Sequence, residues 1–187
     1  MVIFFTPVSL ITFIDVNAAP PVASGTAISA TGTTSPLILG SHTVVDGSNR
    51  LLLVNVGIKD TTGTMVTVSS VIWGTGTDCA DNAESLTSLP LASLTHGTGN
   101  ERIRSESWYL TDATVRTGDV CITVSDSNFD RITAAVVNYD YVDKDVPIPQ
   151  SGTNSGDSST ISGSQASKFG DILFAHSISE KGNEICQ

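Results

Sequence analysis

Three cysteines are the residues of this chain with the clearest chemistry: Cys79, Cys121 and Cys186. Their spacing matches no zinc-binding pattern such as C-x-x-C. In an oxidising compartment we expect Cys79 and Cys121 to form a disulfide, which would tie the loop after Trp73 to the strand of Val120. The alternative is a pair of buried free thiols. Cys186 would then be left to pair with further sequence or with a neighbouring subunit.

Two loops gather acidic side chains, and oxygen ligands held close together are what calcium requires. The first loop is the candidate calcium site and holds Asp78, Asp81 and Glu84. The second loop holds Asp140, Asp143 and Asp145. Neither follows the spacing of an EF-hand loop, and the alternative for both is a solvated acidic surface. No cofactor other than calcium is expected.

Hydrolytic chemistry would need a histidine base or a pair of carboxylates. The histidines are His42, His96 and His176, and the chain has no G-x-S-x-G nucleophile motif. His96 sits in a glycine-rich turn and is the best candidate for an exposed base, whereas His176 lies on an apolar strand face. Glu84, Glu101 and Glu106 show no spacing that singles out a glycosidase pair. The sequence therefore predicts no catalytic residue.

Aromatic side chains could stack on sugar rings if a strand exposes them. Trp108 and Tyr109 are the candidate carbohydrate contacts, and Trp73 is the third large aromatic of interest. Neighbours on a strand face opposite ways, so one member of the Trp108–Tyr109 pair should be exposed. The alternative is that these rings pack in the core. The chain contains no N-x-[ST] glycosylation sequon and no phosphate-binding glycine loop.

The net charge of the 187-residue chain is −10, which argues against nucleic acid and anionic membranes as partners because both repel an acidic surface. Ser, Thr, Gly and Val are abundant, and no long stretch repeats apolar residues at helical spacing. Strands must therefore position the candidate site residues named above. The length allows one domain with a sizeable core.

The strand Arg50–Ile58 is predicted to be central, because every second residue from Leu52 to Ile58 is aliphatic, and so are Leu51 and Leu53 on the other face. Asp46–Asn49 predicts a hairpin turn into it, and the chain up to Trp73 is expected to form an antiparallel meander. Further strands are predicted at Leu89–Thr95, Arg102–Leu110, Asp119–Ser125, Phe129–Tyr139 and Asp171–Ile178. Turn signals every 8–12 residues or so predict an all-β fold, a two-sheet antiparallel β-sandwich of jelly-roll or Greek-key type.

The two ends of the chain carry their own predictions. Residues 1–19 combine an apolar run with small residues before Pro20-Pro21, as in a secretory signal peptide, but they lack a basic start. If retained, they are expected to form an apolar strand that needs a groove, which another subunit could supply. Residues 20–35 are expected to be a linker or an edge segment. Residues 36–187 form the single sandwich domain, whose final strands are predicted to lie beyond Gln187 or on another chain.

The order of these segments is similar to that of a known module. The segments that carry the resemblance are Asn49–Val54, Val68–Gly74, Arg102–Leu110, Thr117–Val124, Ile132–Val137 and Asp143–Pro147. Together they resemble uncharacterised β-sandwich modules of secreted and surface proteins in bacteria and archaea, over about Gly32 to Ile178. The resemblance implies a sandwich fold and an extracellular or cell-surface location. It implies no catalytic residues.

Two functions are compatible with these patterns. The first is a secreted or cell-surface structural or adhesive protein without catalysis, a filament subunit whose apolar N-terminal strand completes the sheet of the next subunit. Its partners would be identical subunits or other surface proteins. The alternative is a carbohydrate-binding module, calcium-dependent if the acidic loop binds the ion, within a larger extracellular protein. A hydrolase is a third and weaker hypothesis.

Overall fold

The computed structural model describes residues 20–61, 64–89, 93–98 and 101–148. Within them the chain forms two antiparallel sheets and one short 3-10 helix, η1 (Thr77–Cys79). Sheet A has the order β1-β10-β3-β8-β6, with β7 also paired to β8. Its strands are β1 (Val22–Gly32), β3 (Leu51–Asp60), β6 (Thr87–Ser88), β7 (Leu94–Thr98), β8 (Glu101–Thr111) and β10 (Arg131–Asp140).

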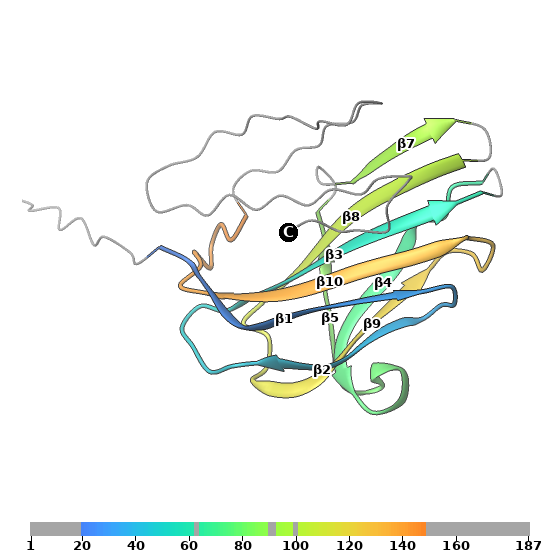
Figure 1. The fold of residues 1–187 in the computed structure, drawn as a ribbon. Coiled ribbons are helices and arrows are strands. Elements are labelled where there is room, and N and C mark those ends of the chain that lie inside the picture. The colour runs from blue at the N-terminus through green and yellow to red at the C-terminus, as the bar shows by residue number, and fades with distance from the viewer. Residues whose placement is uncertain (1–19, 62–63, 90–92, 99–100, 149–187) are drawn as a thin grey trace, which may run out of the picture.

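Sheet B packs against sheet A and has the order β2-β9-β4-β5. Its strands are β2 (Leu37–Val44), β4 (Val68–Thr75), β5 (Asp81–Ser85) and β9 (Arg116–Val124). Figure 1 shows the two layers, with β1, β10, β3 and β8 in one and β2, β9 and β4 in the other. Early and late strands alternate along β1-β10-β3-β8 in sheet A and along β2-β9-β4 in sheet B, which is the connection order of a jelly roll. The predicted two-sheet antiparallel β-sandwich is confirmed.

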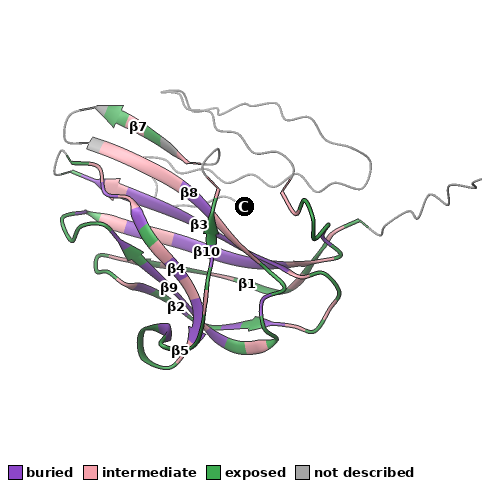
Figure 2. Ribbon diagram, turned by 180° about the vertical axis from the view of Figure 1, so that it is seen from behind, coloured by how far each residue is buried: buried purple, intermediate pink, exposed green. Residues whose placement is uncertain are grey.

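The core lies between the sheets and follows the alternation of the strands. On β3 the inward positions are Leu52, Val54, Val56 and Ile58, and all four are buried in the main apolar cluster. Sheet B contributes Trp73 and Ile122, both fully buried. Figure 2 shows this buried band running along the strands of both sheets. The period-two pattern of aliphatic residues is therefore what brings the two sheets together.

The predicted meander is wrong. Strands β2, β3 and β4 follow one another in the sequence but belong to sheets B, A and B, so none of them pairs with the next. The segment Asp46–Asn49, predicted as a hairpin turn, instead carries the chain from one sheet to the other. The physical reason is that β2 and β3 each bury an apolar face in the core from opposite sheets, which turns alone do not reveal.

Three further segments differ from expectation or lie outside the description. Residues 20–35 contain β1, which pairs with β10 at the edge of sheet A, so of the two expectations the edge segment holds and the linker does not. The region after Trp73, predicted as a loop, contains η1, β5 and β6. The predictions for residues 1–19, for Asp171–Ile178 with His176, and for Cys186 all fall outside the described residues.

Candidate functional site

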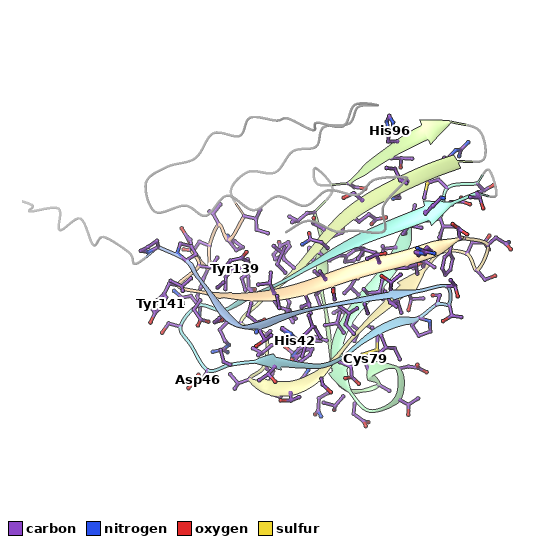
Figure 3. The ribbon with its side chains drawn as sticks, in the orientation of Figure 1. His42, Asp46, Cys79, His96, Tyr139 and Tyr141 are labelled. Atoms are coloured by element: carbon purple, nitrogen blue, oxygen red, sulfur yellow. A yellow bond between two sulfur atoms is a disulfide. The ribbon has the colours of Figure 1, made fainter. Side chains whose placement is uncertain are left out.

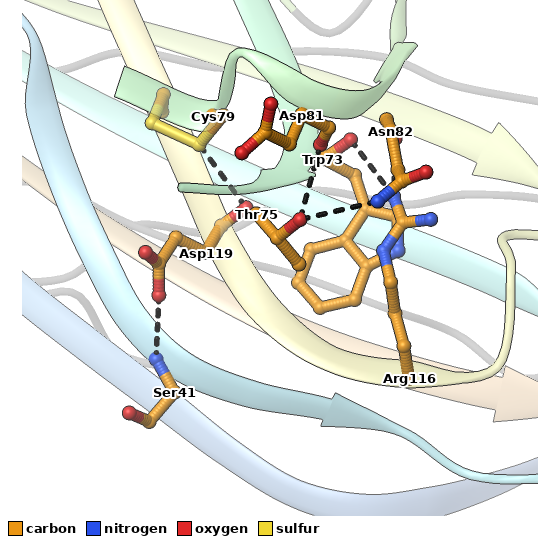
Figure 4. The surroundings of a disulfide bond; sticks show 9 residues. Ser41, Trp73, Thr75, Cys79, Asp81, Asn82, Arg116 and Asp119 are labelled. Atoms are coloured by element: carbon orange, nitrogen blue, oxygen red, sulfur yellow. Dashed lines mark hydrogen bonds between the residues drawn. A yellow bond between two sulfur atoms is a disulfide. The ribbon is translucent and has the colours of Figure 1, made fainter. Parts of the chain in front are cut away.

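The disulfide between Cys79 and Cys121 is present, with the two Cα atoms 6.0 Å apart. It fixes η1 to the outer surface of sheet B, where Cys121 lies on the central strand β9 (Figure 4). The loop needs this fixation because several of its residues have left-handed backbones, including Asp78 at φ 56° and Asn82 at φ 51°. Gly74 allows the close approach, since a Cβ there would lie 2.5 Å from the Cys79 carbonyl oxygen.

Arg116 is the cation at the centre of this region, as Figure 4 shows. Its guanidinium lies over the Trp73 ring at 5.1 Å from the centroid and donates to the carbonyl oxygens of Trp73 and Asn82, at 3.1 and 2.8 Å. It also forms a salt bridge of 2.9 Å with Glu84 on β5. A single side chain therefore joins β9, β4 and β5 through charge, stacking and hydrogen bonds. Sequence reasoning missed Arg116 because its partners are distant in the chain.

The predicted calcium ligands are Asp78, Asp81 and Glu84. The Glu84 carboxylate accepts from Arg116 and from the backbone N–H of Thr114, at 3.3 Å for the latter. Within the described ranges, no three His, Cys, Asp or Glu side chains form a group that could hold a metal ion. Asp78 lies in η1, whereas Asp81 and Glu84 lie on β5. Calcium binding here stays a prediction.

The predicted carbohydrate contacts face opposite sides of sheet A. Trp108 pairs with Val54 and packs against the core, and its Nε1 is buried with no hydrogen-bond partner among the described residues. Tyr109 pairs with Leu53 on the outer face of the sheet and is half-buried. An exposed pair of rings is therefore not formed, although Tyr109 alone faces outward.

His42 is fully buried between the sheets, which sequence reasoning did not anticipate. Its Nε2 lies 3.2 Å from Asn138 Oδ1, and its ring meets the Trp73 ring edge-on at 5.9 Å between centroids. Burial lowers the pKa of this imidazole below its ordinary value, outweighing the hydrogen bond to Asn138. Figure 3 shows that His96 lies on β7, far from His42. The signal that could have placed His42 was its register with Val44 on the inward face of β2.

The β1 edge of sheet A is the surface best suited to receive another chain. β1 is an 11-residue strand without a charged residue or a proline, and most of its residues are exposed. Its ladder with β10 is irregular between Ser24 and Ile28 and then regular through Gly32. Edge strands in monomeric proteins are usually protected by lysines, prolines or inward-pointing charges. The stretch Ile28–Gly32 has none of these.

Comparison of the chain with protein-family profiles, with characterised proteins and with solved structures gives no match. The resemblance to secreted β-sandwich modules therefore stays a prediction. Within the described residues, no helix has the length and apolar character needed to cross a membrane.

Proposed function

We propose that this chain is a non-catalytic, secreted or cell-surface structural module that assembles with identical subunits by strand addition at the β1 edge. The observation that carries the proposal is β1 itself, an exposed and uncharged edge strand of 11 residues. An added strand would satisfy the backbone N–H and C=O groups that β1 directs away from β10. Affinity would come from the main chain, so the donor needs the correct length and little else.

The donor in this proposal is the N-terminal segment of a second copy. Residues 1–19 are apolar and contain one acidic residue and no basic residue. A segment of this kind is long enough to match Ile28–Gly32 and part of the preceding ladder. Since the same chain offers both acceptor and donor, the contact is heterologous and would propagate into a filament.

The disulfide supports the extracellular location, because such bonds persist mainly in oxidising compartments. The net charge of −10 favours a soluble surface that does not bind nucleic acid. Adhesion to other surface proteins would use the same exposed edge.

The test combines negative-stain microscopy with intact mass on secreted material. Filaments built from subunits that retain residues 1–19 are expected. Ser29→Lys should abolish assembly, because it places a charge on the exposed edge strand, whereas Thr123→Lys on the exposed face of β9 should leave assembly unchanged. Monomers that begin near Ala19 or Pro20, or filaments formed by Ser29→Lys, would contradict the proposal.

Carbohydrate binding is the second candidate and rests on Tyr109, the outward-facing member of the aromatic pair. It is less well supported because Trp108 packs against the core. Titration of the protein with glycans, with and without calcium, tests it through tyrosine and tryptophan fluorescence. A response that Tyr109→Ala removes and Tyr141→Ala retains would favour carbohydrate binding over assembly.

A further inference from the structure

The outer face of sheet A, the side turned away from sheet B, is apolar at its centre and buried. Along β3 this face carries Leu51 and Leu53, which are 5% and 4% exposed, and next to them β10 carries Ala135 and Val137 at 3% and 8%. Side chains on a sheet face open to water would keep a much larger exposed fraction. A third layer must therefore cover this face.

None of the described strands supplies that layer. Figures 1 and 2 show the described ribbon as two layers, with sheet B on the opposite side of sheet A from this face. The outer face of sheet B provides the contrast: Thr123 is exposed there and Ile38 is 42% exposed. Among the described residues, sheet B is covered only where η1 lies on Cys121, so the difference between the two outer faces indicates a more extensive cover on sheet A.

Polar groups on the same face point to a cover that hydrogen-bonds. Asn55 is fully buried, and the Ser107 hydroxyl donates to its Oδ1 at 2.8 Å. The Asn55 Nδ2 group is buried and has no acceptor among the described residues. Buried amide donors are almost always paired, so the covering segment should bring a carbonyl or hydroxyl oxygen to Asn55. Burial also raises the pKa of the Tyr139 phenol at the edge of this face.

We propose that the C-terminal segment of the same chain, residues 149–187, forms this third layer, with the run 171–178 seated on Leu51, Leu53 and Val137. In that run Ile172, Phe174 and Ile178 share one side of a strand, which is the pattern needed to lie on an apolar sheet. The residues between Gln150 and Gly170 are mostly Ser, Thr, Gly, Asn and Gln. A segment of about 20 such residues is long enough to serve as a linker over the roughly 30 Å length of a ten-residue strand.

The point where the chain leaves the sandwich also fits. β10 ends at Asp140, beside the outward-facing Tyr139, and Tyr139 pairs with Leu51 at the apolar end of the face. Only residues 141–148 separate this end of β10 from the proposed segment. A segment tethered so close binds at high effective concentration and needs little intrinsic affinity. The described chain begins at the same end, since Val22 pairs with Asp140, so residues 1–19 are the main rival. They reach the sheet through Pro20-Pro21, a stiff connection directly onto the edge strand.

The experiment measures the accessibility of a thiol placed under the proposed cover. In the full chain with Cys186→Ser, Val137→Cys reports on this face, and Thr123→Cys is the exposed reference. Val137→Cys should react with a thiol reagent at least roughly tenfold more slowly than the reference. Adding Phe174→Asp should bring its rate close to the reference, whereas Ser162→Asp, an equal charge in the linker, should leave the protection intact.

A second measurement does not depend on Phe174→Asp folding. A protease site inserted after Ser162 allows the linker to be cut in the folded protein, and the fragment with residues 171–187 should still co-elute on gel filtration. Equal labelling of Val137→Cys and Thr123→Cys, or loss of the cut fragment, would overturn the proposal. So would protection that disappears when residues 1–19 are removed, or that falls on dilution, because the cover would then be the N-terminus or a second copy. The inference does not depend on assembly at β1, and a monomeric protein leaves it intact.

Discussion

Arg116 makes contacts that its charge alone does not explain. Its guanidinium stacks on Trp73, pairs with Glu84 and donates to two carbonyl oxygens. A lysine would keep the charge but not the planar arrangement of donors. We therefore expect Arg116→Lys to lower the free energy of unfolding by about 1 kcal/mol and Arg116→Ala by about 2 kcal/mol. Urea denaturation measures both, and equal stability of Arg116→Lys and the parent protein would refute the argument.

His42 should make the stability depend on pH. Burial holds its pKa in the folded chain below the ordinary value of 6.5 that applies to the unfolded chain. As the pH falls below about 6.5, the unfolded chain binds a proton that the folded chain does not. The free energy of unfolding must then decrease, by at most about 1.4 kcal/mol per pH unit, until the pH reaches the folded pKa.

The check compares unfolding free energies at about pH 7.5 and about pH 5.5, within the range where histidine changes charge. His42→Gln is expected to reduce the difference between the two values, even if it lowers both. His96→Gln removes one histidine from β7 and serves as the matched control. A pH dependence that is the same in His42→Gln and the parent protein would assign it to other groups.

At the scale of single residues, sequence reasoning succeeded where the signal was local. The pairing of Cys79 with Cys121 was predicted, and the alternation of β8 placed Trp108 and Tyr109 on opposite faces. It could not reach His42 and Asn138, whose contact joins residues 96 positions apart in the chain. Such a contact depends on the sheet order, which no local pattern contains.

The disulfide links the η1 loop to strand β9, and its effect belongs to the scale of elements. Cys79 and Cys121 are 42 residues apart, so the bond restricts a loop of that length in the unfolded chain. The chain-entropy treatment gives about 4 kcal/mol for such a loop. We expect reduction, or the double variant Cys79→Ala with Cys121→Ala, to lower the unfolding free energy by about 2–4 kcal/mol. Cys186→Ser is the control for loss of a thiol, and an unchanged urea midpoint on reduction would contradict the prediction.

Two polar links join the sheets at opposite ends of the sandwich. At one end Asn138 on β10 donates to the carbonyl oxygen of Thr43 on β2. At the other end the buried Glu106 carboxylate on β8 accepts from the backbone N–H of Val68 on β4, at 3.0 Å, and pairs with Arg104 at 2.6 Å. These links fix how the sheets lie over an otherwise apolar core, where packing alone is less directional.

Glu106→Leu should therefore cost about 3 kcal/mol of unfolding free energy, because it leaves the buried Val68 N–H and the Nε of Arg104 without an acceptor. Glu106→Gln keeps an acceptor oxygen and should cost about half as much. Thermal or urea unfolding of both variants gives the comparison. If Glu106→Leu is as stable as Glu106→Gln, the carboxylate does not hold the sheets together.

The elements themselves were largely predictable, and their connections were not. Alternating aliphatic residues located β3, β8, β9 and β10 to within a few residues, because burial on one sheet face imposes period two. The predicted meander was wrong because the sequence pattern does not distinguish two arrangements. Strands paired side by side in one sheet and strands facing each other across a sandwich show the same alternation of apolar residues. β1 was ambiguous because its small residues give little periodicity, and only its ladder with β10 shows its place.

The whole molecule is closed by pairing its first described strand with its last. β10 lies between β1 and β3 in sheet A and supplies Ile132, Ala134 and Val136 to the core. No described strand other than β10 pairs with β1. A jelly roll of this order cannot form its first sheet until the chain has been completed through Asp140, since the partners in that sheet are distant in sequence.

A chain that ends at Asp126 tests this dependence, because it keeps β1 to β9 and loses only β10 among the described strands. We expect it to show no cooperative urea transition, since β1 loses its only described partner and β3 exposes one whole edge of the core. A chain that ends at Ile148 is the matched control, because it also loses residues 149–187 but keeps every described ladder. A cooperative transition in the chain that ends at Asp126, with an unchanged denaturant dependence, would mean that sheet B and part of sheet A fold without closure. The sandwich would then consist of separable halves, and β1 would be free to pair with a strand from another chain before β10 arrives.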